Sequence, residues 1–212
     1  MLTKLFLVLC RRRCYASYVP EKDVIDGVYE TTKMYVEVGG ETVTKTFKKA
    51  RNSETRYARE KRAFECFKGL EGFPQLISFD DETFTLVMSR LPGKMPTSLD
   101  EDQVIQLRRL VGGMLAQGVA RHAIPVRDLL LSDAGKLGMV DFERVSFRLF
   151  EISPIWKIGK IVSRYHLYRL INGYQPQMLS GSEKILLKIV NGISGAGRPI
   201  KALKKRVRGL FR

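Results

Sequence analysis

The stretch that decides the fold is GVARHAIPVRDLLLSDAGKLGMVDFERV, residues 118–145. It contains two short apolar runs, at 129–131 and 137–140, separated by a Ser-Asp-Ala-Gly turn. Two such runs around a tight Asp/Gly turn predict a β-hairpin. Asp128 stands just before the first run and Asp141 just after the second. Because both positions lie at the open end of the hairpin, the two carboxylates can converge on one metal ion.

This order of elements resembles the active-site segment of protein kinases, where a catalytic loop and a hairpin precede the magnesium-binding Asp-Phe-Gly. Here Asp141 is followed by Phe142 and Glu143. The kinase spacing, counted back from Asp141, places Asp128 at the second metal-binding position and Ala123 at the position of the catalytic base. The resemblance therefore implies Asp141 and Asp128 as magnesium ligands, with no base where the family has one.

A second register of the motif is open. It would make Asp128 the catalytic base, since Arg127-Asp128-Leu129 also resembles the kinase motif, and Asp133 the metal ligand. That register leaves only residues 133–141 for two strands and a turn, which is too short. The first register is preferred.

The neighbours of Ala123 could take over part of the missing chemistry. His122 could accept the proton of the phosphoryl acceptor, and Arg121 could stabilise charge on the phosphate. An anchor for the loop is the alternative interpretation of His122. The candidate catalytic residues are thus His122, Arg121 and Asp128.

Residues 32–49 alternate in polarity on either side of Gly39-Gly40, which predicts a second β-hairpin. Val43, Lys45 and Phe47 share one strand face, so the Lys45 ammonium points inward and needs a counter-charge. Val-Thr-Lys also resembles the kinase motif whose lysine contacts the nucleotide phosphates. A snorkelling lysine with its amine in water is the alternative.

A helix predicted over residues 54–69 can supply the counter-charge. Its apolar face carries Tyr57, Phe64 and Phe67, and Glu60 falls on that same face. In kinases a Lys–Glu ion pair joins the third strand to the following helix. We expect Lys45 and Glu60 to form this pair, the alternative being an acid at the edge of the apolar face that reaches solvent.

The next segment predicts strands at 73–77 and 84–88, a Pro-Gly turn, and a helix over 100–117. A strand ending in Met88 before such a turn resembles the linker between kinase lobes, which implies that Met88 lies beside the adenine of the nucleotide. Two kinase parts are missing. No glycine-rich loop precedes Lys45, and no Ala-Pro-Glu follows Glu143.

The net charge of +15 is concentrated at the ends of the chain. Residues 198–212 hold seven Lys/Arg and no acid, and their apolar positions repeat at helical spacing. This pattern is typical of a helix that rests on anionic lipid, so an anionic membrane surface or glycolipid is the expected partner of this basic tail. A helix packed on the body is the alternative. Sparse aromatic residues disfavour nucleic acid.

The three cysteines do not form a disulfide pattern, which favours a reducing compartment. The apolar run near the N-terminus precedes its basic triplet, the reverse of a secretory signal. No run approaches the roughly 20 apolar residues needed to span a bilayer. We expect a monomer in the cytoplasm, peripheral at the inner, cytoplasmic membrane.

The pieces within residues 24–150 resemble the small bacterial kinase-like proteins of the lipopolysaccharide-core heptose kinase group and their regulatory relatives. That resemblance implies a reduced, two-lobed, protein-kinase-like α+β fold with a basic C-terminal helix. The expected parts are a basic N-terminal segment (1–23), a small β-rich N-lobe (24–91), a mostly helical C-lobe (92–190) and an amphipathic tail (191–212).

The resemblance also implies ATP and Mg²⁺ as cofactors and a phosphoryl acceptor on a membrane glycolipid, as in lipopolysaccharide biosynthesis. The expected function is that of an ATP-dependent kinase-like phosphotransferase. Ala123 and the missing glycine-rich loop keep two alternatives open. One is a pseudokinase, a nucleotide- or membrane-binding regulatory module without transfer activity. The other is a basic membrane adaptor with only an ancestral likeness to kinases.

Overall fold

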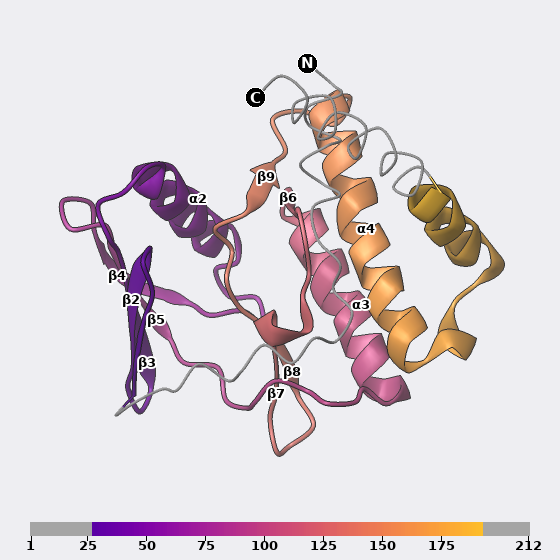
Figure 1. Cartoon of the computed structure of the whole chain (residues 1–212), viewed down its shortest axis with the longest axis horizontal. Helices are drawn as coiled ribbons and strands as arrows, with labels where there is room; N and C mark the ends of the chain where they lie inside the picture. Colours follow the sequence, from indigo (N-terminus) through magenta and orange to yellow (C-terminus); the bar gives the residue numbers. More distant parts are fainter. Residues whose placement is uncertain (1–26, 193–212) are drawn as a thin grey trace, which may run out of the picture.

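The computed structural model describes residues 27–192 of the chain. An antiparallel sheet with one helix comes first, and a mostly helical part follows (Figure 1). The elements in order are β1 (Val28–Glu30), β2 (Met34–Val38), β3 (Thr42–Phe47), α2 (Ser53–Cys66), β4 (Leu76–Asp80), β5 (Thr85–Ser89), α3 (Glu101–Ala116), β6 (Val119–Arg121), the 3₁₀ turn η1 (Val126–Asp128), β7 (Leu129–Leu131), β8 (Leu137–Met139), β9 (Val145–Phe147), α4 (Pro154–Tyr174) and η2 (Pro176–Met178). Residues 181–192 are also helical. The α+β class is confirmed.

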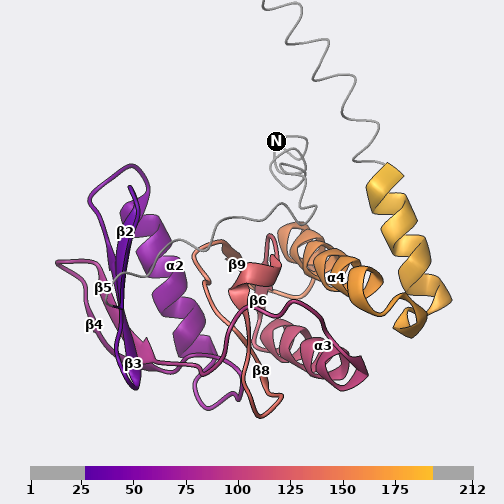
Figure 2. The ribbon, with the colours of Figure 1, turned by 60° about the horizontal axis from the view of Figure 1, so that its bottom comes forward.

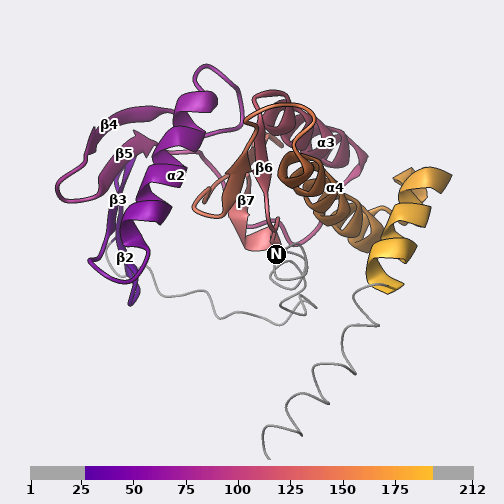
Figure 3. The ribbon, with the colours of Figure 1, turned by 90° about the horizontal axis from the view of Figure 1, so that it is seen from above.

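The first part is a five-stranded sheet in the order β1-β2-β3-β5-β4, with α2 against one face (Figure 3). The predicted hairpin around Gly39-Gly40 is β2–β3, in which Val36 pairs with Lys45. Apolar side chains of β3, β5 and α2 fill the space between sheet and helix. They include Phe47, Tyr57, Phe64, Leu86 and Met88.

The hairpin predicted within residues 118–145 is β7–β8, with Leu129 opposite Met139 and Leu131 opposite Leu137. The linker that follows β5 is bonded to it, because the backbone groups of Lys94 and Leu131 exchange two hydrogen bonds of 3.0 and 2.8 Å. Gly93 makes this approach possible. A Cβ built on it would lie 2.4 Å from the carbonyl carbon of Leu131, and its φ is +115°.

The second part packs α3 against α4, with the short β6–β9 pair beside them (Figure 2). A capping box formed by Asp100 and Gln103 starts α3. The inward faces of the two helices carry apolar side chains. These are Val104, Leu107, Val111, Met114, Leu167, Leu170 and Ile171, all buried.

Most predicted elements occur close to their expected limits, but the predicted strand at 73–77 is displaced. The strand β4 starts at Leu76 and ends at Asp80. Pro74 has no N–H to donate to a ladder, and Phe73 is buried in the core instead. The hydrophobic pattern predicted a strand in this region, but the strand starts only after Pro74 because proline cannot donate a ladder hydrogen bond.

Two expectations lie outside the described residues, namely the basic N-terminal segment and the amphipathic helix over 198–212. Within residues 27–192, every helix is too short or too polar to cross a lipid bilayer.

Candidate functional site

The core of the candidate site is an ion-pair cluster of Lys45, Glu60 and Asp141. The Lys45 Nζ lies 2.7 Å from Glu60 Oε2 and 3.2 Å from Asp141 Oδ1. Lys45 comes from β3, Glu60 from α2, and Asp141 from the segment after β8. The expected ion pair between Lys45 and Glu60 is therefore confirmed. The cluster also includes Asp141, so three distant stretches of sequence meet at one ammonium.

Burial makes this cluster unusual. Lys45 is 7% exposed and Glu60 is 1% exposed, whereas the Asp141 side chain is 39% exposed. The alternatives of a snorkelling lysine and a solvent-facing glutamate are therefore wrong. Burial opposes the charge of Lys45, but Glu60 and Asp141 outweigh that effect and raise its pKa above the ordinary value. The ammonium stays protonated, held between two acids.

Asp141 adopts the left-handed backbone conformation, with φ +66°. A non-glycine residue there is strained, and such strain persists only where its surroundings enforce it. The next residue supplies the force. The Phe142 N–H donates to Glu60 Oε1 at 3.0 Å, and its fully buried ring packs against Phe64, Phe67 and Phe73. The backbone twist directs the Asp141 carboxylate to Lys45 while Phe142 anchors the segment.

Asp128, the second expected metal ligand, is held by arginine. The Arg121 Nη2 donates to Asp128 Oδ2, and the Arg121 Nη1 donates to the Val140 carbonyl at 3.0 Å. Both side chains are buried. Burial raises the pKa of Asp128 to about 6, against the opposing pull of Arg121. The Asp128 carboxylate is thus bonded inside the protein, and so is the guanidinium expected to stabilise phosphate.

The main chain nevertheless brings the two acids close. The Val140 N–H donates to the Asp128 carbonyl at 2.9 Å, so Asp128 lies beside the residue that precedes Asp141. The negative charge of Asp141 also contributes to the raised pKa of Asp128. The open end of the hairpin therefore gathers both carboxylates, and Asp128 is the one that the Arg121 guanidinium binds directly.

His122 faces β9. Its imidazole Nε2 is 2.7 Å from Ser146 Oγ, and the backbone N–H of His122 donates to the Arg144 carbonyl at 3.1 Å. Burial, followed by the charges of Arg59 and Arg144, lowers the pKa of the imidazole. These contacts are those of a loop anchor, the alternative interpretation of this residue. A role for His122 as the base stays a prediction, as does the lack of a catalytic base at position 123.

Met88 lies inside β5, opposite Val43 of β3, and its side chain belongs to the core. The two N–H groups that follow it are already bonded, Ser89 to the Gln75 carbonyl at 2.8 Å and Arg90 to the Glu41 carbonyl at 2.7 Å. The structure thus gives Met88 a packing role in the sheet, and its contact with adenine stays a prediction.

The sequence reasoning also missed the largely buried ion pair between Arg56 and Glu143. Arg56 Nη1 lies 3.3 Å from Glu143 Oε2, and the Arg56 guanidinium stacks 5.5 Å from the Phe47 ring centre. Arg56 precedes Glu60 by one helical turn, so the two share a face of α2. That spacing was the available signal. This pair and the Lys45 cluster both join α2 to the segment after β8.

The donor set suits one carboxylate at a magnesium ion better than two. Residues 27–192 hold no group of three or more His, Cys, Asp or Glu side chains able to hold a metal ion. Mg²⁺ is commonly held by one or two carboxylates together with substrate phosphates and water. Asp141 is accessible for this purpose. Asp128 fits only when Arg121 releases it.

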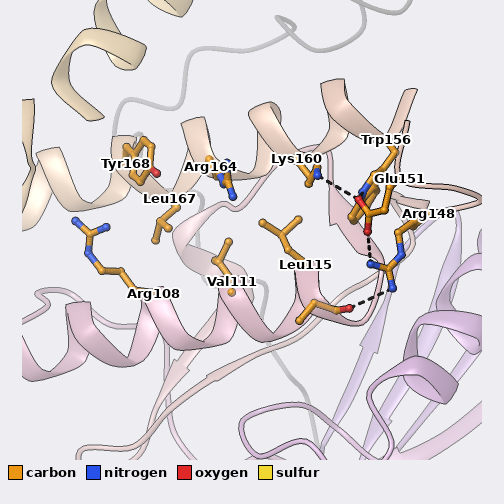
Figure 4. Close-up of a pocket in the computed structure, with 12 residues that line it drawn as sticks. Arg108, Val111, Leu115, Arg148, Glu151, Trp156, Lys160, Arg164, Leu167 and Tyr168 are labelled. Carbon is orange, nitrogen blue, oxygen red and sulfur yellow. Dashed lines mark hydrogen bonds and ion pairs between the residues drawn. The ribbon is translucent and has the colours of Figure 1, made fainter. Parts of the chain in front are cut away.

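Two hollows of the described chain lie away from this cluster. One, of about 410 Å³, is between α3 and α4, and its lining includes Arg108, Arg148, Trp156, Lys160 and Arg164 (Figure 4). The other, of about 340 Å³, is lined by Lys49, Ala50, residues 52–55 and Phe84. Neither is lined by Lys45 or Asp141.

No protein-family model matches this chain, and no curated protein matches it. Solved structures of WbdD are among those that this chain resembles. The high-resolution crystal structure of WbdD matches with 11% identity and a TM-score of 0.48, covering 78% of this chain and 44% of WbdD. The complex of WbdD with the kinase inhibitor LY294002 matches with 14% identity, a TM-score of 0.45 and coverage of 77% and 44%.

A third structure, described as the bifunctional kinase-methyltransferase WbdD, matches with 14% identity, a TM-score of 0.45 and coverage of 74% and 47%. The chain spans less than half the length of these WbdD chains. A likeness this distant leaves the function to be argued from the geometry of the site.

Proposed function

We propose that this chain is a kinase-like protein that binds a nucleoside triphosphate with Mg²⁺ at Lys45 and Asp141 and transfers a phosphoryl group. The observation that carries the proposal is the Lys45–Glu60–Asp141 cluster. Lys45 and Asp141 are 96 positions apart in sequence, yet their charged atoms lie 3.2 Å apart. A buried lysine set by two acids, one of them partly exposed, is characteristic of functional sites.

The charge of the cluster supports a bound cation. One ammonium and two carboxylates give a net charge of −1, and Arg56 is already paired with Glu143. Leaving a negative charge partly buried is unfavourable unless a cation compensates it. Asp141 would hold Mg²⁺ and Lys45 would contact the nucleotide phosphates, with Glu60 keeping Lys45 in position. ATP would supply the phosphoryl group.

The proposed acceptor is a sugar hydroxyl of a membrane glycolipid, of the lipopolysaccharide-core kind, at the cytoplasmic face of the inner membrane. The family resemblance and the basic ends of the chain support this choice. Phosphoryl transfer depends mostly on positioning and on charge stabilisation, so a site without an aspartate base can retain activity. The acceptor proton would then leave to water or to the phosphate itself.

A thermal-shift titration with ATP and Mg²⁺ tests nucleotide binding. A ligand that binds only the folded state, at 100 times its Kd, stabilises the protein by about 2.7 kcal/mol. We expect a magnesium-dependent rise in Tm for the native chain, which Asp141→Asn abolishes. Asp133→Asn, at an exposed position in the β7–β8 turn, is the matched control and should keep the full shift. The absence of any shift in the native chain would refute the proposal.

A second candidate is a pseudokinase that binds nucleotide but transfers no phosphate. The buried bond between Arg121 and Asp128 favours it, because that bond occupies both an expected metal ligand and an expected phosphate ligand. Magnesium-dependent binding without consumption of radiolabelled ATP, in the presence of core glycolipid, would establish this second function. Transfer of label to the glycolipid would establish the first.

A further inference from the structure

The segment that joins β9 to α4 exposes an unusual number of large apolar side chains. Leu149 and Ile152 are each 76% exposed, and Phe150 and Ile155 are each 56% exposed. All four fall within seven consecutive positions. In Figure 1 this segment lies at the upper end of α4, where that helix begins. We call residues 148–157 the apolar loop.

The apolar loop is fixed at both ends. The Arg148 N–H donates to the Gly118 carbonyl at 2.7 Å, and the Ser153 N–H donates to the Phe150 carbonyl at 3.2 Å. Near the C-terminal end of the apolar loop, the buried Trp156 donates its Nε1–H to Glu151 Oε2 at 3.3 Å. The backbone is therefore already set in the conformation that presents these side chains to solvent.

The surroundings of the apolar loop are strongly basic. Residues 144–164 hold five basic side chains, Arg144, Arg148, Lys157, Lys160 and Arg164, and one acid, Glu151. Glu151 is itself occupied, with Arg148 Nη1 at 2.6 Å and Lys160 Nζ at 3.5 Å. Figure 4 shows Arg148, Lys160 and Arg164 along the groove between α3 and α4. Basic side chains thus flank the exposed apolar positions on both sides in sequence, and we call these five residues the basic cluster.

A second copy of the chain suits this surface poorly. A standard protein interface uses about 20–30 residues on each side, far more than the four side chains of the loop. A symmetric contact would also place the basic cluster of one copy against the basic cluster of the other. Like charges placed together in this way disfavour association. The basic cluster favours an anionic partner, and the exposed apolar side chains favour an apolar one.

A bilayer with acidic lipids meets both requirements. We propose that the apolar loop docks on an anionic membrane surface, with Leu149, Phe150, Ile152 and Ile155 entering the interface and the basic cluster binding the lipid phosphates. This docking site differs from the basic tail expected at 198–212, and it stands whether or not the chain transfers phosphate.

Co-sedimentation of the full chain with vesicles tests the proposal. The vesicles are phosphatidylcholine alone or phosphatidylcholine with phosphatidylglycerol. The double variant Leu149→Ser/Phe150→Ser is compared with Ile77→Ser/Phe79→Ser, which likewise removes one aliphatic and one aromatic side chain, here from exposed positions on β4. We expect the loop variant to lower binding to anionic vesicles on the order of tenfold. The β4 variant should bind as the native chain does.

Equal binding by the loop variant and the native chain would overturn the proposal and assign vesicle binding to another segment. A change from dimer to monomer in the loop variant without lipid would also overturn it, in favour of a second copy as the occupant. Tm measurements without ligand establish that both variants fold.

An independent arm keeps the proposal testable if the double variant fails to fold. Phe150→Trp adds a reporter to a chain whose only tryptophan, Trp156, is buried. Anionic vesicles should shift its emission to the blue, and neutral vesicles should leave it unchanged. An emission maximum that stays at its solvent value on anionic vesicles would refute insertion. None of these measurements depends on nucleotide, so failure here is distinguishable from failure of the proposed function.

Discussion

Glu60 makes the most demanding set of contacts in the candidate site. It is 1% exposed, pairs with Lys45 through one oxygen, and accepts the Phe142 N–H with the other. A carboxylate this deeply buried is unfavourable without such partners. Its position therefore serves the geometry of Lys45 and Asp141 as well as the fold.

Replacing Glu60 with Gln tests that double role. The amide keeps the shape but leaves Lys45 with Asp141 alone, and removing one partner of a buried pair costs about 3–5 kcal/mol at most sites. We expect the free energy of unfolding in urea to fall by about that amount, less what the remaining contact between Lys45 and Asp141 contributes. The magnesium–ATP thermal shift should also fall. Glu65→Gln, at an exposed position of α2, is the control and should change neither measurement.

His166 is buried on α4, and neither ring nitrogen has a hydrogen-bond partner within the described chain. Burial lowers its pKa to about 3, and the positive charges of Arg169 and Arg121 act in the same direction. The unfolded imidazole has a pKa near 6.5. The unfolded state therefore binds the proton first as the pH falls.

His166 therefore lowers the stability of the folded state as the pH falls. Above pH 6.5 both states are neutral at His166, so it adds no pH dependence. Below that value the unfolded state gains a proton and stability falls, by about 1.4 kcal/mol for each pH unit down to about pH 3. We expect His166→Phe to lose stability less steeply between pH 6.5 and 4 in urea unfolding. Parallel curves for the two proteins would contradict this assignment. The difference between the curves removes the opposite contribution of Asp128, whose raised pKa favours the folded state as the pH falls from 6.

At the scale of elements, the hairpin β7–β8 and the linker after β5 depend on one another. Gly93 has φ +115° and leaves no room for a Cβ beside the Leu131 backbone. The sequence indicated a Pro-Gly turn here, but not that the hairpin tip of another element would press against it.

Gly93→Ala should therefore destabilise the protein by about 1–3 kcal/mol, from backbone strain and from the clash. Gly113→Ala is the matched change within α3, where a Cβ would meet nothing within 4 Å. It should stabilise by about 0.5–1 kcal/mol, since alanine favours helix. Urea unfolding of both variants checks the two opposite signs. A Gly93→Ala protein as stable as the native one would show that the linker can move away from the hairpin.

Local patterns account for most elements. The strand alternation around Gly39-Gly40, the apolar face of α2 and the Asp/Gly turn of β7–β8 are all properties of short segments, and the elements formed as predicted. The exception is β4, where Pro74 interrupts an otherwise apolar run. A periodic pattern reports burial, which Phe73 indeed has, but it does not report which N–H groups are available to a ladder.

At the scale of the whole molecule, one aromatic residue joins the two parts of the chain. Phe142 follows β8, yet its ring contacts Phe64 and Phe67 of the first part. The Lys45 cluster and the Arg56–Glu143 pair cross the same boundary. These contacts should make the chain unfold in one cooperative step.

Trp156 lies in the helical part, so its fluorescence reports that part alone, whereas circular dichroism reports the whole chain. We expect the two urea transitions to coincide in the native protein. Phe142→Ala removes the shared ring, at a cost of about 3–5 kcal/mol. The two transitions should then separate. Val145→Ala, a buried residue of β9 within the second part, is the control and should lower stability while keeping them together.

The sequence by itself determined the α+β order, the two hairpins, the helix that carries Glu60 and the pairing of Lys45 with Glu60. Each of these follows from periodicity or turn chemistry within a few residues, or from a buried charge that needs a partner. Only the tertiary structure decided which partners the remaining charges took. Asp128 pairs with Arg121, His122 with Ser146, and Asp141 joins Lys45. No local pattern encodes those choices, because each depends on how distant segments pack and on which carboxylate stays partly exposed to solvent.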